Sequence, residues 1–407
     1  MRRSRPDAGL SRRAVREAVD NFVRRPAAGT FGTRANYGEV VRHGLVTVFL
    51  SGDVMTGRGV DQILPRPGDP RLWETHVRDA RTYVELAEAV NGPIAYPVDV
   101  SWPWGDALET LDGVAPDVRL INLETAVTRS DDVAAGKRVH YRMSPDNAAC
   151  LAAARPDACA LANNHVLDFG YRGLGETLDV LAAAGTRPTG AGRDTSEAAR
   201  PAMVAVDGGH RVGIFSFGTR SSGIPTNWAA TSDRPGIDFL PDLSDTTADA
   251  VADRMVKQPG DITVASIHWG SNWGYHVPAD HVRFAHRLVD RGVDVVHGHS
   301  SHHPRPIEVY RGRLILYGCG DLVDDYEGIG GHHEYRDDLR LLYFASLEPD
   351  TGTLARLRMA PLQAHRMRLR HPSAADSEQL RSTLDRISRP FGSRIDLAEG
   401  MLRLARQ

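Results

Sequence analysis

Short apolar runs alternate with longer amphipathic stretches along most of the chain. The apolar runs are rich in β-branched residues and predict buried strands at residues 45–50, 118–122, 203–206, 212–217, 262–267, 293–296 and 314–317. The stretches between them are rich in Ala and Leu and predict helices at residues 145–154, 173–184, 245–256 and 279–291. Residues 341–347 and 354–359 then follow one another as strands of a mixed or antiparallel sheet. This alternation predicts an α/β fold.

The two ends of the chain depart from the alternation. Residues 10–25 show the spacing of an amphipathic helix that ends near Pro26, so we predict an N-terminal helical arm over residues 1–44. The catalytic domain is then expected over residues 45–370. A helical tail is expected over residues 371–407.

An insertion rich in proline and aromatic residues interrupts the domain at residues 61–107. It holds six prolines and follows directly on the first predicted strand. Such an insertion is typical of a lid or a substrate wall, although a packed surface excursion explains the composition equally well. We therefore take Trp102 and Trp104 as candidate substrate-binding residues, together with Trp269 and Arg305 farther along the chain.

Charge and cysteine content exclude several classes of protein. A formal net charge of -3 gives no general attraction to nucleic acid or to an anionic membrane. The three cysteines form no CxxC pair, so neither a disulfide framework nor a thiolate metal site is expected, and a reducing cytoplasm is the default. The arginine-rich start has no apolar segment behind it, and no apolar run is long enough to span a membrane.

Five predicted strands end in residues that commonly bind metals. These residues are Asp53 in LSGDV, Glu124 in INLET, Asn163, Asn164, His165 and Asp168 in LANNHVLD, His268 in SIHWG, and His297, His299, His302 and His303 in VVHGHSSHH. Because ligand sites in open α/β sheets form at the carboxyl ends of strands, we expect the five segments to converge. Each residue alone is more typical of a cap, a turn or a satisfied histidine, but the ensemble predicts a metal site. The donor set suits one or two divalent ions, namely Mn, Fe or Zn, or Ca or Mg where oxygens dominate.

The motifs GD, NLE, ANNHxxDxG, HWG and GHxxHxxxPIE follow in this order between about residues 45 and 325. Their order and spacing resemble the CapA-like family of the metallo-dependent phosphatase superfamily, whose best-known members take part in poly-γ-glutamate capsule synthesis. The resemblance implies a four-layer αββα sandwich with the site at the edge of the sheets. It implies the metal ligands Asp53, Glu124, Asn164, His268, His299 and His302. His165 would then be an acid or base beside the metal.

The sequence departs from the wider superfamily at three places. Met55 stands where the phosphatases carry the histidine of an Asp-x-His pair, which removes one ligand of the first metal and weakens the case for a two-metal phosphoryl clamp. Val166 follows His165 where an acidic residue is usual, and Ser300 and Ser301 replace a His-Pro pair. Capsule-synthesis members also tend to carry a membrane anchor, and we identify none here.

Two reactions fit a site of this kind. Metal-assisted hydrolysis of a phosphoester or an amide needs an activated water. Cα epimerisation of a residue in a ribosomal precursor peptide needs a base on each face of the carbon, for which we take His165 and His297, with Asp168 orienting His165. The surplus of histidines favours epimerisation, and soluble CapA-like proteins of GC-rich bacteria include epimerases that act on lasso-peptide precursors.

A role related to poly-γ-glutamate and a non-catalytic, metal-stabilised binding protein remain as alternatives. In the favoured reading the substrate is a peptide, and no nucleic acid or membrane partner is expected. The sequence leaves the oligomeric state open.

Overall fold

The computed structural model of the chain describes residues 44–405. The N-terminal arm expected over residues 1–44, with its helix at 10–25, therefore lies outside the described residues except for Gly44. Within the described part, no helix combines the length and the apolar character that crossing a bilayer requires.

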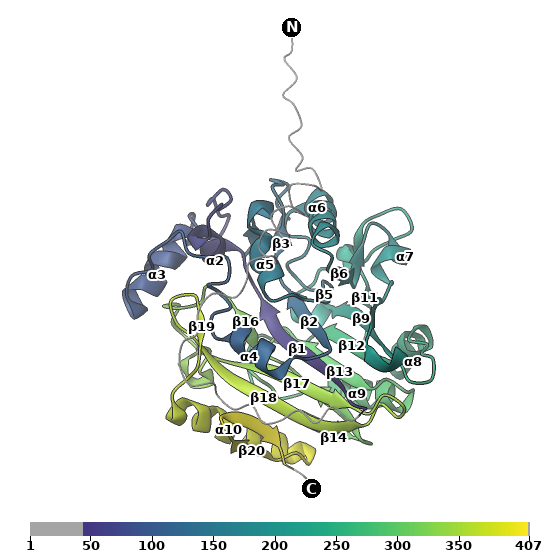
Figure 1. Ribbon diagram of the computed structural model, residues 1–407. Helices are drawn as coiled ribbons and strands as arrows, with labels where there is room; N and C mark the ends of the chain where they lie inside the picture. Colours follow the sequence, from purple (N-terminus) through teal and green to yellow (C-terminus); the bar gives the residue numbers. More distant parts are fainter. Residues whose placement is uncertain (1–43, 406–407) are drawn as a thin grey trace.

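The larger of two main sheets has ten strands, and β1 lies in its middle between β17 and β2 (Figure 1). The strands β1, β2, β5 and β6 are parallel to one another, whereas β17, β18, β21 and β20 continue the sheet on the other side of β1 in antiparallel pairs. The members are β1 (Val46–Val54), β2 (Val118–Leu123), β5 (Ala158–Ala160), β6 (Arg187–Thr189), β16 (Asp321–Val323), β17 (Leu339–Leu347), β18 (Leu354–Ala364), β19 (Leu369–Arg370), β20 (Ile395–Ala398) and β21 (Met401–Leu404).

The second sheet has seven strands and is mostly parallel. Its central strands β9, β12, β13 and β15 run in the same direction, while β8 and β14 pair antiparallel at its margins. The members are β8 (Ala202–Ala205), β9 (Arg211–Thr219), β11 (Phe239–Leu240), β12 (Ile262–His268), β13 (Val295–His299), β14 (Ile307–Tyr310) and β15 (Arg313–Leu316). Two short pairs lie outside both sheets: β3 (Ala126–Val127) with β4 (Arg142–Met143), and β7 (Ala191–Gly192) with β10 (Gly236–Ile237).

The two main sheets pack face to face over one apolar core. Val48 and Leu50 of β1 belong to the same buried cluster as Ile262 and Val264 of β12. Successive side chains of a strand point to opposite faces, so alternate residues of each strand fill the space between the sheets. Full burial of such an aliphatic side chain contributes about 1.5–3 kcal/mol relative to exposure, which makes this shared core a main source of stability.

Helices cover the outer face of each sheet. Phe49 and Ile121 of the large sheet pack with side chains of α3, α4 and α6, whereas Ile267 of the smaller sheet packs with Phe284 of α9 and Val251 of α8. The helices are α2 (Arg58–Ile63), α3 (Arg81–Asn91), α4 (Ala107–Val114), α5 (Ala149–Ala153), α6 (Gly170–Ala183), α7 (Thr195–Ala198), α8 (Asp245–Arg254), α9 (Ala279–Asp290) and α10 (Ala374–Ser388). The α/β class expected from the sequence is confirmed.

The C-terminal segment differs from the helical tail expected over residues 371–407. It holds one helix, α10, followed by the hairpin β20–β21, and β21 pairs with β18 of the large sheet. Leu380 and Leu384 of α10 join the core between the two sheets, together with Ile395 and Leu402 of the hairpin. The segment is therefore an integral part of the core, because its apolar residues complete one side of it.

Candidate metal centre

The strand ends of both sheets meet at Asp53, near the end of β1. Ligand atoms of Asp53, His268 and His299 all lie within 4.8 Å of one another, and so do those of Asp53, His302 and Asp321. All five side chains are buried. Asp53 therefore belongs to two possible ligand groups at once, one made with histidines of the smaller sheet and one made with Asp321 of the large sheet.

Asp321 is a possible ligand that the sequence analysis did not identify. It lies at the start of β16, in register with Asp53 of the neighbouring β1, and the amide of Asp53 donates to the carbonyl of Gly320 at 2.9 Å. A Cβ atom on Gly52 would lie 1.9 Å from that carbonyl, so this close approach requires glycine. The Gly-Asp pair of residues 320–321 repeats the Gly-Asp pair of residues 52–53, and this repetition was the available signal.

Carboxylates crowd this centre. Burial, followed by the neighbouring Asp321, raises the pKa of Asp53 to about 7. Burial and the nearby Asp53 raise the pKa of Glu124 well above its usual range. The amide of Asn122 donates to both, to Asp53 Oδ1 at 2.7 Å and to Glu124 Oε2 at 3.2 Å. A divalent cation among these groups would oppose their mutual repulsion and favour their ionised forms.

His302 contacts this carboxylate cluster at Asp321. Its Nδ1 lies 2.9 Å from Asp321 Oδ1, and although burial disfavours the charged ring, Asp321 raises the pKa of His302. Its Nε2 lies 2.8 Å from the side chain of Asn272. His302, which the resemblance implies as a ligand, thus lies in the second possible ligand group.

A chain of hydrogen bonds fixes the tautomer of His299. His297 Nε2 donates to the carbonyl of Ser51 at 2.8 Å, so His297 Nδ1 accepts from the hydroxyl of Ser266 at 3.0 Å. The oxygen of Ser266 then accepts from His299 Nε2, also at 3.0 Å. The remaining nitrogen of His299, Nδ1, is left with a lone pair.

That lone pair faces a second one. His268 Nε2 lies 3.0 Å from Asn164 Oδ1 and donates to it, which leaves His268 Nδ1 as an acceptor only 2.7 Å from His299 Nδ1. Burial lowers the pKa of both rings well below its usual range, so neither supplies a second proton. Two facing lone pairs repel unless a cation lies beside them, and the donor set therefore fits a bound metal ion.

His165 lies at the rim of the cluster with Asp168 behind it. Nδ1 of His165 is 2.6 Å from Asp168 Oδ2, and Nε2 is 3.8 Å from Glu124 Oε1. Burial lowers the pKa of His165 to about 4, an effect that Asp168 partly opposes. The ring is thus held by one nitrogen and turned toward the centre with the other.

Lys137 is a further member of this group that the sequence reading missed. Its ammonium group contacts Asp168 Oδ1 and the carbonyl of Asn164, and it lies 5.2 Å from the ring centre of Trp228. Lys137 and Lys257 are the only lysines of the chain. Nothing in the sequence indicates that Lys137 lies beside the LANNHVLD segment, because residue 137 belongs to a loop with no regular pattern.

His297, expected as the second catalytic base, lies in a different place. It is fully buried between the sheets, and both of its ring nitrogens are engaged by Ser51 and Ser266. A base needs a lone pair that faces the substrate. This side chain orients the metal-site histidine His299 through Ser266, and it cannot be the base that we expected.

Of the four candidate substrate-binding residues, three are buried in the fold and Trp102 is partly buried. Trp104 is fully buried and donates to the carbonyl of Cys150 at 2.7 Å, and Trp102 donates to the carbonyl of Arg366 at 2.9 Å. Trp269 is buried and stacks on His281, with ring centres 4.7 Å apart. The guanidinium of Arg305 donates to the carbonyls of Ser271 and His276 and braces the loop between them. Aromatic composition alone did not show which rings face inward.

Two tyrosines line the metal centre instead. The rings of Tyr141 and His165 are 4.3 Å apart, and the rings of Tyr326 and His302 are 5.2 Å apart. The two phenol oxygens share a hydrogen bond of 2.6 Å. Arg58 lies over the Tyr141 ring, 4.6 Å from its centre. These residues form a wall that connects the two histidines on either side of the centre.

Comparisons with known proteins agree with this architecture. The family model described as "Bacterial capsule synthesis protein PGA_cap" matches residues 47–326, which include all of the candidate ligands. A probable polyglutamine synthesis accessory protein of Mycobacterium tuberculosis is 56% identical over 354 residues, covering 86% of this chain and 93% of the relative. The PGA biosynthesis protein CapA of Bacillus subtilis is 29% identical over 322 residues, covering 77% of this chain and 70% of the relative.

The capsule biosynthesis protein CapA of Bacillus anthracis is more distant, at 24% identity over 69% of this chain. The match to the family model extends from β1 to the loop after β16 and so spans the strand ends that form the metal centre. The chain belongs to the bacterial capsule synthesis protein family, PGA_cap.

Proposed function

We propose that this chain is a divalent-cation-dependent hydrolase that cleaves an amide bond in a chain containing glutamate or glutamine. The observation that carries the proposal is that Asp53 belongs to two buried ligand groups at once. A ligand shared by two groups is typical of two-metal hydrolytic sites. The substrate class follows the names of similar proteins, which refer to polyglutamine synthesis and to PGA biosynthesis.

The donors fit Mn, Fe or Zn better than Ca or Mg, because each of the two groups combines a carboxylate with an imidazole. Asp53, His268 and His299 would hold one ion, and Asp53, His302 and Asp321 would hold a second. A bound cation polarises the carbonyl under attack and makes a nearby water more acidic. Stacked sheets with helices outside and a site at the strand ends also support a fold of the metallo-dependent phosphatase type.

His165 is placed to move a proton during cleavage. Its Nδ1 donates to Asp168, so the lone pair of the neutral ring is on Nε2, the nitrogen that faces Glu124. From this position Nε2 can accept a proton from the attacking water and return it to the leaving amine. Asp168, fixed by Lys137, holds the imidazole in this orientation, as the carboxylate does in a hydrolytic triad.

The structure supports epimerisation less than the sequence did. It needs a base on each face of the substrate carbon, and His297 has no nitrogen left for that task. Asp321 also adds a ligand beside His302, so the loss of the Asp-x-His histidine at Met55 no longer counts against a two-metal centre. Both observations favour hydrolysis.

The proposal is tested with synthetic α- and γ-linked oligoglutamates and with oligoglutamine, each incubated with the Mn-, Fe- and Zn-loaded protein. We expect new amino termini and ¹⁸O in the product from labelled water. His165→Asn should lower the rate by about 10²–10⁴-fold while it retains bound metal, because only the proton-transfer group is removed. The exposed His76 offers a matched control, and His76→Asn should leave the rate unchanged.

One result would contradict hydrolysis, and a second would contradict the role of His165. One is deuterium uptake at Cα in heavy water with no shortening of the chain, which is the signature of epimerisation. The other is unchanged cleavage in His165→Asn, which would remove the assigned role of this side chain.

A further inference from the structure

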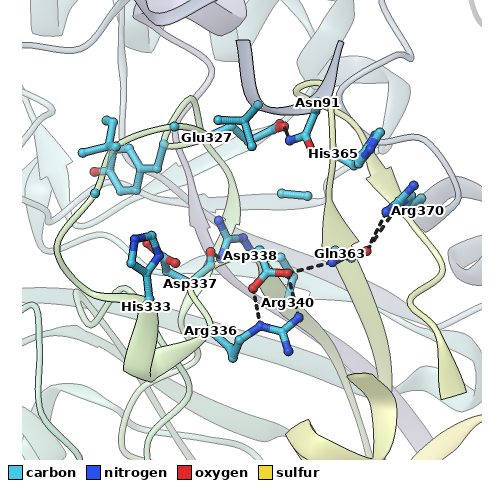
Figure 2. Close-up of a pocket in the computed structure, with 16 residues that line it drawn as sticks. Asn91, Glu327, His333, Arg336, Asp337, Asp338, Arg340, Gln363, His365 and Arg370 are labelled. Carbon is cyan, nitrogen blue, oxygen red and sulfur yellow. Dashed lines mark hydrogen bonds and ion pairs between the residues drawn. The ribbon is translucent and has the colours of Figure 1, made fainter. Parts of the chain in front are cut away.

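A polar pocket of about 510 Å³ opens beside the metal centre. It lies between the end of α3, the loop after β16 and the ends of β18 and β19, and Figure 2 shows the side chains that face it. Tyr326 belongs to its lining. The same tyrosine packs edge-on against His302 and bonds to Tyr141, so it connects the pocket with the ligand cluster.

Two acidic side chains of the pocket are already hydrogen-bonded within the protein. Asp338 accepts from Arg336 at 2.8 and 2.9 Å and from Gln363 at 2.7 Å. The carboxylate of Glu327 accepts from the Asn91 amide and from the backbone amide of Arg366. Figure 2 shows the side-chain members of both groups turned toward one another. Asp338 is thus paired with a cation, whereas Glu327 is held by neutral donors.

The arginines of the lining differ in their partners. Arg336 is paired with Asp338 and Asp376, and Arg340 is paired with Asp324. Asp337 is the third acidic residue of the lining. Arg370 differs from the other arginines of the pocket, because its guanidinium contacts only the amide oxygen of Gln363, at 2.9 and 3.2 Å. Among the described residues, no carboxylate forms an ion pair with it.

The side chain of Arg370 is exposed and stands beside His365, across the pocket from His333 (Figure 2). Two apolar side chains also belong to the lining. Val90 is 64% exposed and Ile329 is 39% exposed. The lining thus offers a cation for a carboxylate and an aliphatic surface for the methylene groups that carry it.

We infer that this pocket is a subsite for a carboxylate-bearing segment of a peptide whose scissile bond lies at the metal centre. The inference rests on the proposed function for the position of that bond, and it narrows the substrate class from glutamate or glutamine to glutamate. Arg370 is the specificity-determining residue, because a guanidinium binds a carboxylate through two parallel N–H donors and has no equivalent preference for a neutral amide.

The test is calorimetric binding of two capped tetrapeptides, tetraglutamate and tetraglutamine, to the metal-free full chain. We expect tetraglutamate to bind about tenfold more tightly than tetraglutamine, since a hydrogen bond to a charged group is stronger than one to a neutral amide. Arg370→Gln should remove this difference. Arg172→Gln is the matched control, because Arg172 is an exposed arginine on α6 that is paired with Glu176. Ile329→Asp should weaken tetraglutamate binding through repulsion.

Equal binding of the two peptides, or a preference for tetraglutamate that survives in Arg370→Gln, would overturn the inference. Binding to metal-free protein makes this result independent of the hydrolytic proposal. If tetraglutamate binds through Arg370 but is never cleaved with metal present, hydrolysis fails and the subsite stands. If oligoglutamate is cleaved and Arg370→Gln binds it as the wild type does, the subsite fails and hydrolysis stands.

Discussion

Two groups of buried charged side chains lie close together in this fold, and they are built in opposite ways. Around Arg58, opposite charges are in contact: Asp325 binds its guanidinium through two contacts, and Glu74 binds it at 2.9 Å. At the metal centre, Asp53 and Asp321 bring like charges together with Glu124 nearby. A compensated network holds a structure in place, whereas an uncompensated one needs a ligand to complete it.

The same contrast separates the aromatic insertion from the metal centre. The indole of Trp104 has its hydrogen bond to Cys150, and the ring is fully buried. The facing nitrogens of His268 and His299 have only each other. Burial alone therefore does not identify a functional residue. A buried polar atom that lacks a suitable hydrogen-bond partner is the better indicator.

The largest effect should come from breaking the compensated network. Asp325→Asn leaves the buried Arg58 with a single carboxylate partner, and the loss of one partner of a buried ion pair costs about 3–5 kcal/mol. We expect a lower unfolding free energy in urea, by about the lower end of this range because Glu74 remains. The decrease should be the same with and without metal. A variant that is destabilised only in the presence of metal would place Asp325 in the metal centre instead.

Asp53→Asn should behave in the opposite way. Without metal it should be as stable as the wild type or more stable at neutral pH, because the substitution removes one charge from a like-charged cluster. The wild type should gain about 2.7 kcal/mol when the metal is at a hundredfold excess over its Kd, and the variant should gain nothing. Thermal unfolding with and without metal, together with elemental analysis, measures both effects. Equal metal content in the two proteins would refute the shared role of Asp53.

Much of this contrast could be read from the sequence, because it depends on strand ends. Asp53, His268 and His299 each follow a contiguous apolar run, and parallel strands bring their carboxyl ends to one edge whatever their exact packing. Those three residues do meet, as expected. Asp321 was missed because β16 has only three residues, and three residues separate Asp321 from the apolar run at residues 314–317. The strand β5 was not predicted from the sequence either, because it too has only three residues.

Side-chain orientation could not be read in the same way. His297 and His299 lie two residues apart on β13 and share a face, yet one contacts the ligand cluster and the other bonds to Ser51 across the gap between the sheets. The partner that decides this lies 246 residues away in the chain. Trp102 and Trp104 found their partners in the same long-range manner, through Arg366 and Cys150. Local composition carries no information about such contacts.

The hydrogen-bond chain through Ser266 offers a sharper test of the metal centre. Ser266→Ala removes the group that fixes the tautomer of His299 without touching a ligand. Loss of an outer partner of a metal-binding histidine typically lowers metal affinity by about 10–100-fold. Competition with a fluorescent chelator measures this change, and Ser271→Ala on the nearby loop is the control. Unchanged affinity in Ser266→Ala would mean that the tautomer of His299 is set in another way.

The last effect is pH-dependent and concerns a buried histidine that belongs to neither group. His281 stacks on Trp269, and burial lowers its pKa to about 4 from an unfolded value near 6.5. The unfolded chain therefore binds one more proton than the folded chain between these values, so stability falls as the pH decreases from 6.5 to 4. His281→Phe keeps a ring against Trp269 and should remove up to about 1.4 kcal/mol per pH unit from that slope. Urea unfolding of the metal-free wild type and variant across this range provides the measurement. If the unfolding free energies of wild type and variant changed in parallel with pH, His281 would be protonated in the folded protein over this range. The contrast between compensated and uncompensated burial would then apply to the carboxylates alone.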